Sequence, residues 1–177
     1  CVLPGYGEGF DLPLIADLLC SQKVTLTDFS PALLSVFLEH IQGTGARYPD
    51  LRALIVGGEE MTPSLAARCG QMLPAVKLHN FYGPSEASIG AICHALGDTV
   101  EGVVPIGRPI DNVVVALVDD ALRPVPIGCP GEILLGGDCV GIGYLGDAEA
   151  SAAGFIAPEL PMYGSSRFYR TGDMARY

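Results

Sequence analysis

Strand-like and helix-like runs alternate through about the first 95 residues, and this alternation restricts the possible folds more than any other feature. The helix-like runs cover residues 11–23, 30–42 and 62–73, and the strand-like runs cover residues 24–29, 51–60 and 75–83. Short strands separated by helices are typical of βαβ units, whose strands form a parallel sheet. We therefore predict an α/β lobe with a parallel sheet over residues 1–103.

Local signals support the individual helices. The first helix-like run has one apolar face, made by Leu12, Ile15, Leu18 and Leu19. The second run opens with Ser30 as a cap and Pro31 at the first helical position, and Gly43 is its expected stop.

Helical patterns fade after about residue 104. Strand-like runs at 112–126, 131–137 and 167–173 are divided by Gly, Pro and Asp turns, and one short helix is expected at 147–155. Residues 104–177 are therefore predicted to form a smaller, antiparallel, barrel-like region.

The composition excludes several classes of function. A net charge of −10 argues against nucleic-acid or anionic-membrane partners, because both need clustered Lys and Arg. No run of 18 apolar residues and no signal peptide is present, so a cytosolic protein is expected. The cysteines lack metal-ligand spacing and are interpreted as free, mostly buried thiols, namely Cys1, Cys20, Cys69, Cys93, Cys129 and Cys139.

Residues suited to a nucleotide follow two of the strand-like runs, where ligands gather in parallel α/β sheets. Gly57 and Gly58 would let the backbone approach a flat ligand closely. Asn80 could pair with the edge of a base, and Tyr82 could stack on one. Taken singly, each segment is better explained by an ordinary turn.

The segment YGPSE adds a hydroxyl and a carboxylate to the same turn, at Ser85 and Glu86. Carboxylate oxygens are the protein ligands that Mg²⁺ prefers. Binding of a metal ion and a phosphate group would explain why this acidic chain has one more carboxylate on its surface.

Five segments occur in the order found in adenylate-forming enzymes: LRALIVGGEEMTP, NFYGPSEASIGA, VPIGRPIDN, GEILLGGDCVGIGYLGD and FYRTGD. Over nearly its whole length the chain resembles an amino-acid-activating adenylation domain of a nonribosomal peptide synthetase. The proline in YGPSE and the YRTGD form are more similar to that branch than to the acyl-CoA ligases. The resemblance implies the large N-terminal lobe of such a domain, in part.

The resemblance also implies that ATP and Mg²⁺ are used to form an aminoacyl-adenylate. Adenine-binding positions would be Gly57, Gly58, Asn80, Phe81 and Tyr82. Ser85 matches a contact to the α-phosphate, Glu86 matches the Mg²⁺ ligand, and Asp173 matches the carboxylate that accepts both ribose hydroxyls. The implied partners are an amino-acid substrate and a peptidyl carrier protein domain in the parent chain.

Parts of the family's site have no counterpart in these 177 residues. The glycine-rich phosphate loop is absent, and neither Lys23 nor Lys77 matches the catalytic lysine of the family. The chain is therefore expected to be an internal fragment, without the C-terminal lobe, that is inactive in isolation.

By resemblance, six residues would line the pocket for the substrate side chain: Asp28, Ile55, Gly57, Phe81, Ile89 and Gly90. A carboxylate in an apolar pocket needs a partner, so Asp28 could meet a cationic or hydrogen-bonding side chain. An equally good interpretation is that Asp28 is a helix cap or turn residue.

Two other functions stay open at this point. One is an acyl-CoA or aryl-CoA ligase of the same superfamily. The other is a nucleotide-binding domain without catalysis. A carrier-protein domain following the adenylation region in the parent gene would exclude the first.

Overall fold

The computed structural model describes residues 1–2, 11–97, 102–164 and 167–177. The chain divides into two compact units. The first consists of Cys1–Phe81 and His94–Gly107, and the second of Tyr82–Cys93 and Arg108–Tyr177. The domain boundary expected at residue 103 stays a prediction.

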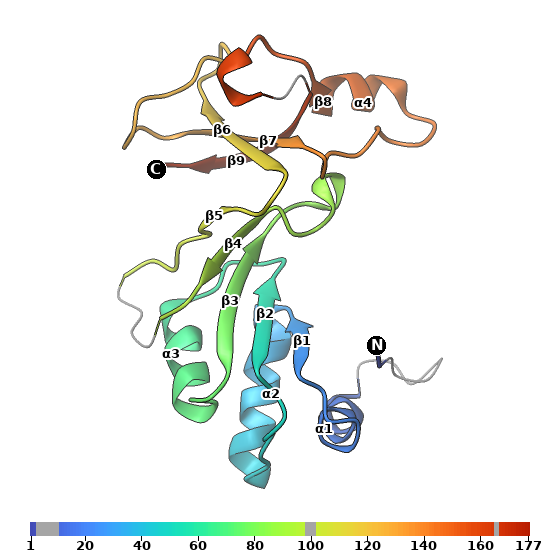
Figure 1. Ribbon diagram of the computed structural model, residues 1–177, viewed down its shortest axis with the longest axis vertical. Helices are drawn as coiled ribbons and strands as arrows, with labels where there is room; N and C mark the ends of the chain where they lie inside the picture. Colours follow the sequence, from blue (N-terminus) through green and yellow to red (C-terminus); the bar gives the residue numbers. More distant parts are fainter. Residues whose placement is uncertain (3–10, 98–101, 165–166) are drawn as a thin grey trace. The chain divides into compact units, whose positions relative to one another are not determined.

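Helices and strands alternate through the first unit, beginning with a helix (Figure 1). In chain order they are α1 (Leu12–Ser21), β1 (Leu26–Phe29), α2 (Pro31–Thr44), β2 (Ala53–Gly57), α3 (Pro63–Met72) and β3 (Lys77–Tyr82). β1 pairs with β2, and β2 pairs with β3, both in parallel. The parallel-sheet α/β lobe expected from the alternating runs is therefore confirmed.

Short strands continue this sheet, which has the order β1-β2-β3-β4-β5. They are β4 (Ile92–Ala95) and β5 (Arg108–Pro109), which pair antiparallel to one another. Neither strand was expected from the sequence, because two to four residues are too few for a periodic pattern.

The second unit carries a separate, curled sheet of four antiparallel strands in the order β6-β7-β9-β8. These strands are β6 (Val113–Val118), β7 (Gly131–Gly137), β8 (Phe155–Ile156) and β9 (Phe168–Ala175). The expected short helix is α4 (Ala148–Gly154), and two 3₁₀ turns are η1 (Ser85–Ala87) and η2 (Pro161–Tyr163). The antiparallel, barrel-like region is confirmed.

Helix α2 begins and ends at identifiable caps. The Ser30 hydroxyl accepts a hydrogen bond from the Leu33 amide at 3.2 Å, as an N-cap does. The helix ends at Gly45, whose φ of 67° is left-handed and whose amide donates to Ile41 O at 2.8 Å. The expected stop at Gly43 was wrong by two residues, because the left-handed cap needs the later glycine.

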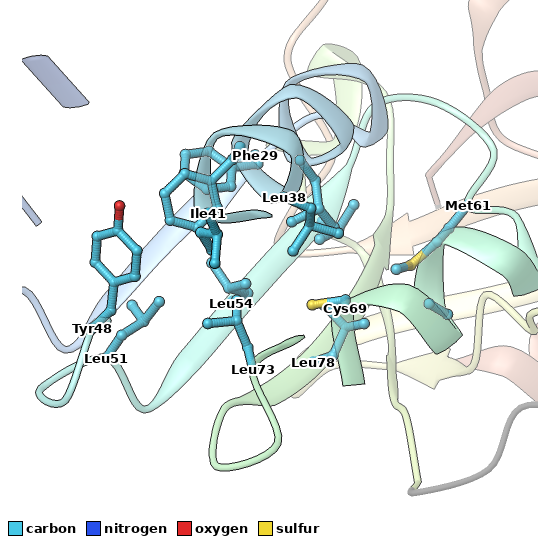
Figure 2. Packing of buried hydrophobic residues seen from close by; sticks show 14 of the residues in the cluster. Phe29, Leu38, Ile41, Tyr48, Leu51, Leu54, Met61, Cys69, Leu73 and Leu78 are labelled. Atoms are coloured by element: carbon cyan, nitrogen blue, oxygen red, sulfur yellow. The ribbon is translucent and has the colours of Figure 1, made fainter. Parts of the chain in front are cut away.

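The helices of the first unit cover one face of its sheet with a continuous apolar core. Phe37 and Leu38 of α2 are fully buried, as is Leu54 of β2. Figure 2 shows this packing around Leu54, with Cys69 of α3 among the buried side chains. Burial raises the pKa of the Cys69 thiol to about 11, so this thiol stays protonated at neutral pH.

The cysteines are free thiols, as expected. The expectation that most are buried was wrong. Only Cys69 is fully buried, whereas Cys1, Cys20 and Cys129 are exposed. Apolar sequence neighbours do not decide the burial of a residue in a turn or at a helix end.

Across the described part of the chain, no helix combines the length and the apolar character that crossing a bilayer requires.

Candidate nucleotide-binding site

The carboxyl ends of the parallel strands bring four predicted pocket residues onto one face of the sheet. Strand residues alternate between faces, and Leu54 and Val56 of β2 are buried against the helices. Ile55 and Gly57 therefore lie on the opposite face. In the parallel register Asp28 pairs with Ile55, and Gly57 pairs with Phe81.

Gly57 is required by the close approach of β3. A Cβ atom at this position would lie 2.7 Å from the carbonyl oxygen of Phe81. Gly58 has a φ of 88°, a left-handed conformation that favours glycine. Both glycines thus have a structural role, and their predicted contact with adenine is an additional expectation.

Asn80 is the only buried polar residue among the described ones. Its Nδ2 donates a hydrogen bond to the carbonyl oxygen of Pro105 at 2.9 Å, within the first unit. This bond uses one of the two N–H donors of the amide, so the second N–H and the amide oxygen are left for a base.

Asp28 is exposed and lies in strand β1, not at a helix end. The cap of α2 is Ser30, so the interpretation of Asp28 as that helix cap was wrong. A groove of about 610 Å³ runs between β1 and α1, and Asp28 lines it.

In the second unit, Tyr82 and Asp173 meet although 91 residues separate them in sequence. The Tyr82 hydroxyl donates a hydrogen bond to Asp173 Oδ2 at 2.5 Å. Burial, together with this hydrogen bond, raises the pKa of Tyr82 far above its usual value. The phenol therefore stays neutral and remains a donor to the carboxylate.

Strand β9 holds Asp173 through its neighbours. The Asp173 amide donates to Thr171 Oγ1 at 3.0 Å, and that hydroxyl donates to Ile133 O at 2.8 Å. Arg170 forms an ion pair with Glu132 at 2.6 Å, and Glu132 also accepts the Gly172 amide. The TGD turn is thus fastened to β7.

Ser85 and Glu86 lie in η1, inside a loop that is held by hydrogen bonds within its own backbone. The Ile89 amide donates to Pro84 O at 3.0 Å, and the Ala91 amide donates to Tyr82 O at 3.0 Å. Ser85 is exposed.

The same loop contains two strained residues, Ser88 and Ile89, with φ of 58° and 70°. A left-handed conformation is rare for a β-branched residue, and such strain is concentrated at functional sites. Ile89, a predicted pocket residue, is 75% exposed, and the amide of Gly90 donates to Ser88 O at 2.8 Å.

Glu86 is held by an aromatic hydroxyl that the sequence did not point to. The Tyr144 hydroxyl donates to Glu86 Oε1 at 2.6 Å and lies 3.3 Å from the hydroxyl of Tyr169. The hydrogen bond from Tyr144 lowers the pKa of Glu86, and its own amide and Tyr169 contribute. Tyr144 lies in the segment GYLGD, but a tyrosine in an apolar run carries no signal of its partner.

The carboxylate of Glu86 suits Mg²⁺ as a single protein ligand. Among the residues placed by the structure, no group of three or more His, Cys, Asp or Glu side chains could hold a metal alone. Mg²⁺ in nucleotide sites is commonly bound through one or two carboxylates and the substrate phosphates. An ionised, hydrogen-bonded Glu86 fits that arrangement.

The mixed α/β sheet and the curled antiparallel sheet are those of the N-terminal lobe of adenylation domains. Residues 1–145 match the model of the family "AMP-binding enzyme". The chain belongs to this family, as part of an adenylation domain of the nonribosomal peptide synthetase type.

The chain is similar to phosphinothricin tripeptide synthetase PhsB of Streptomyces viridochromogenes, with 41% identity over 167 residues. The similarity covers 94% of this chain and 14% of that synthetase. The chain thus spans about one seventh of this relative.

Two solved structures resemble the fold closely. PA1221, a nonribosomal peptide synthetase protein containing adenylation and PCP domains, has a TM-score of 0.82 and 27% identity over 94% of this chain and 33% of its own. The synthetase FmoA3 in its AMPPNP-bound form has a TM-score of 0.85 and 29% identity over 98% of this chain and 19% of its own.

Proposed function

We propose that this chain forms the middle of an adenylation domain that activates an amino acid for nonribosomal peptide synthesis. The domain would use ATP to form an aminoacyl-adenylate and release pyrophosphate. The observation that carries this proposal is the hydrogen bond from Tyr82 to Asp173, because it joins the two motifs expected to bind adenosine. The similar synthetase that was solved with AMPPNP supports a nucleotide as the ligand.

The proposed roles follow from the chemistry of each side chain. Asp173 accepts the two ribose hydroxyls, since an ionised carboxylate has enough lone pairs for both. Tyr82 stacks on the base while its hydroxyl fixes Asp173. The backbone of Gly57, Gly58 and Phe81 forms the wall against which the base lies, and the amide of Asn80 pairs with the edge of the base.

Ser85 and Glu86 act at the phosphates. The exposed hydroxyl of Ser85 donates to the α-phosphate, and Glu86 binds Mg²⁺. When bound, Mg²⁺ offsets the charge of the phosphate oxygens. The carboxylate oxygen of the amino acid then forms a bond to the α-phosphorus, and the bond from the α-phosphorus to the bridging oxygen breaks, so that the electron pair leaves with pyrophosphate.

The carrier-protein partner is proposed from the PA1221 structure, which contains adenylation and PCP domains. A carrier thiol would accept the aminoacyl group after activation. We also propose a cytoplasmic protein. Nucleic-acid partners are not proposed, because the net charge of the chain is −10.

The test is amino-acid-dependent exchange of labelled pyrophosphate into ATP, measured on the full-length protein that we propose contains this chain. The panel holds the common amino acids, ornithine, fatty acids and aryl carboxylic acids. Exchange stimulated by one or a few amino acids is expected. Exchange stimulated only by fatty or aryl acids, with CoA ester formation, would support a CoA ligase instead, and no exchange with any acid would support a domain without catalysis.

A further inference from the structure

Tyr144 contacts the proposed metal ligand. It lies in the segment GEILLGGDCVGIGYLGD, but the proposed function gives it no role. Its hydroxyl donates to Glu86 Oε1 at 2.6 Å. Both residues belong to the second unit. The contact joins positions 58 residues apart, so it depends on the fold and not on local sequence.

The ring of Tyr144 is held in place by its neighbours. It packs edge-on against Phe155 with a centroid distance of 5.4 Å, and Phe155 packs on Tyr169 at 5.1 Å. The Tyr144 amide donates to Ser151 Oγ of α4 at 2.8 Å, and that hydroxyl donates to Asp147 O at 2.6 Å. The phenol is therefore fixed at its ring and at its backbone.

The loop that carries Tyr144 also grips the backbone beside Glu86. The Gly141 amide donates to Glu86 O at 2.8 Å, and Ser88 Oγ donates to Cys139 O at 2.9 Å. A Cβ atom at Gly141 would lie 3.2 Å from Glu86 O, so the approach of the two loops is close. Main chain and side chain of Glu86 are thus positioned by the same segment.

We propose that Tyr144 is a positioning residue for the metal ligand: its hydroxyl holds Glu86 through Oε1 and presents the second carboxylate oxygen to Mg²⁺. This inference rests on the proposed function. Ligating carboxylates are commonly hydrogen-bonded by outer partners, whose loss weakens metal affinity about 10–100-fold. Tyr169, whose hydroxyl lies beside that of Tyr144, completes the support.

The decisive variant is Tyr144→Phe, which removes one oxygen and keeps the ring in its aromatic cluster. In the full-length protein with AMPPNP, a Mn²⁺ titration followed by electron paramagnetic resonance should show about tenfold weaker metal binding. The Mg²⁺ concentration for half-maximal exchange should rise by about tenfold, while the rate at saturating Mg²⁺ stays within about twofold. Tyr163→Phe, the same change at a tyrosine that packs in another cluster of this unit, should leave both titrations unchanged.

Glu86→Gln serves as the reference, and it should weaken metal-dependent adenylation by at least about tenfold. If Glu86→Gln shifts the metal titrations and Tyr144→Phe does not, the positioning role is wrong and the proposed function stands. If Glu86→Gln itself behaves as the wild type, Glu86 is not a ligand and the inference falls with it. Absence of exchange in the wild-type protein would instead count against the proposed function.

Discussion

At the scale of single residues, Asp28 offers a test of substrate class. It shares a sheet face with Ile55, and it is exposed and lines a groove in this chain. If it pairs with the ammonium group of a basic substrate, Asp28→Asn in the full-length protein should lower kcat/KM for that amino acid by about a hundredfold or more. Breaking a buried charge pair costs about 3–5 kcal/mol. The KM for ATP should not change.

The control for this prediction is Asp17→Asn, an exposed aspartate on helix α1 of the same unit. It should leave the exchange profile over the amino-acid panel unchanged. Equal profiles for Asp28→Asn and the wild type, or a wild-type preference for an apolar amino acid, would reject the pocket role of Asp28.

At the scale of elements, the loop between β3 and β4 depends on one glycine. A Cβ atom at Gly83 would lie 2.5 Å from Ile89 O and 2.8 Å from Ala91 N, both backbone atoms. Gly83→Ala should therefore destabilise the chain by about 1–3 kcal/mol, the usual cost of overpacking. Differential scanning calorimetry of the 177-residue chain should show a melting temperature lower by at least about 2 °C.

The matched change is Gly70→Ala in helix α3, where a Cβ atom would meet nothing within 4 Å. Alanine is favoured over glycine inside a helix by up to about 1 kcal/mol, so this variant should melt at the same or a higher temperature. A Gly83→Ala protein that melts like the wild type would show that the loop can shift to admit the methyl group.

The sequence predicted elements that have a period or a cap. The apolar face around Ile15, the Ser30 cap and the β-branched runs all became the expected helices and strands. Gly43 was mistaken for the stop of α2, because two nearby glycines look alike until the backbone φ is known. A strand as short as β8 has no recognisable sequence pattern, because its strand conformation depends on pairing with β9.

The candidate site was predictable only where a motif names the residue. The motifs assign roles to Tyr82, Glu86 and Asp173. Tyr144 and Glu132 lie in one of the matching segments without an assigned role, and they act through contacts that span 58 and 38 residues. The contact of Glu132 depends on how β7 pairs with β9, and that of Tyr144 depends on where its loop lies against η1; both are properties of the folded chain. Sequence alone therefore proposes the ligand-binding groups and leaves out those that position them.

At the scale of the whole molecule, both units carry residues with proposed roles. The first unit carries Asn80, Phe81 and the sheet face with Asp28, which are assigned to the base and the substrate side chain. The second carries Tyr82, Glu86 and Asp173, which are assigned to the base, the metal and the ribose, together with the predicted pocket residues Ile89 and Gly90. The chain passes from one unit to the other between Phe81 and Tyr82, so the proposed adenine contacts of this one motif belong to both units.

We expect the 177-residue chain by itself to be nearly inactive. Its only lysines are Lys23 and Lys77. Lys23 lies just after α1, and Lys77 is the first residue of β3, far from the carboxyl end of that strand. Neither is suited to neutralise charge on the transferred phosphate, and each preorganised donor of this kind contributes about 10²–10³ in rate. The purified chain should therefore give less than about one thousandth of the amino-acid-dependent pyrophosphate exchange of the full-length protein.

The same chain should still show an unfolding transition in a calorimeter, because the first unit has its own buried core. Exchange by the chain alone at a rate near that of the full-length protein, stimulated by an amino acid, would show that the 177 residues contain a complete catalytic centre.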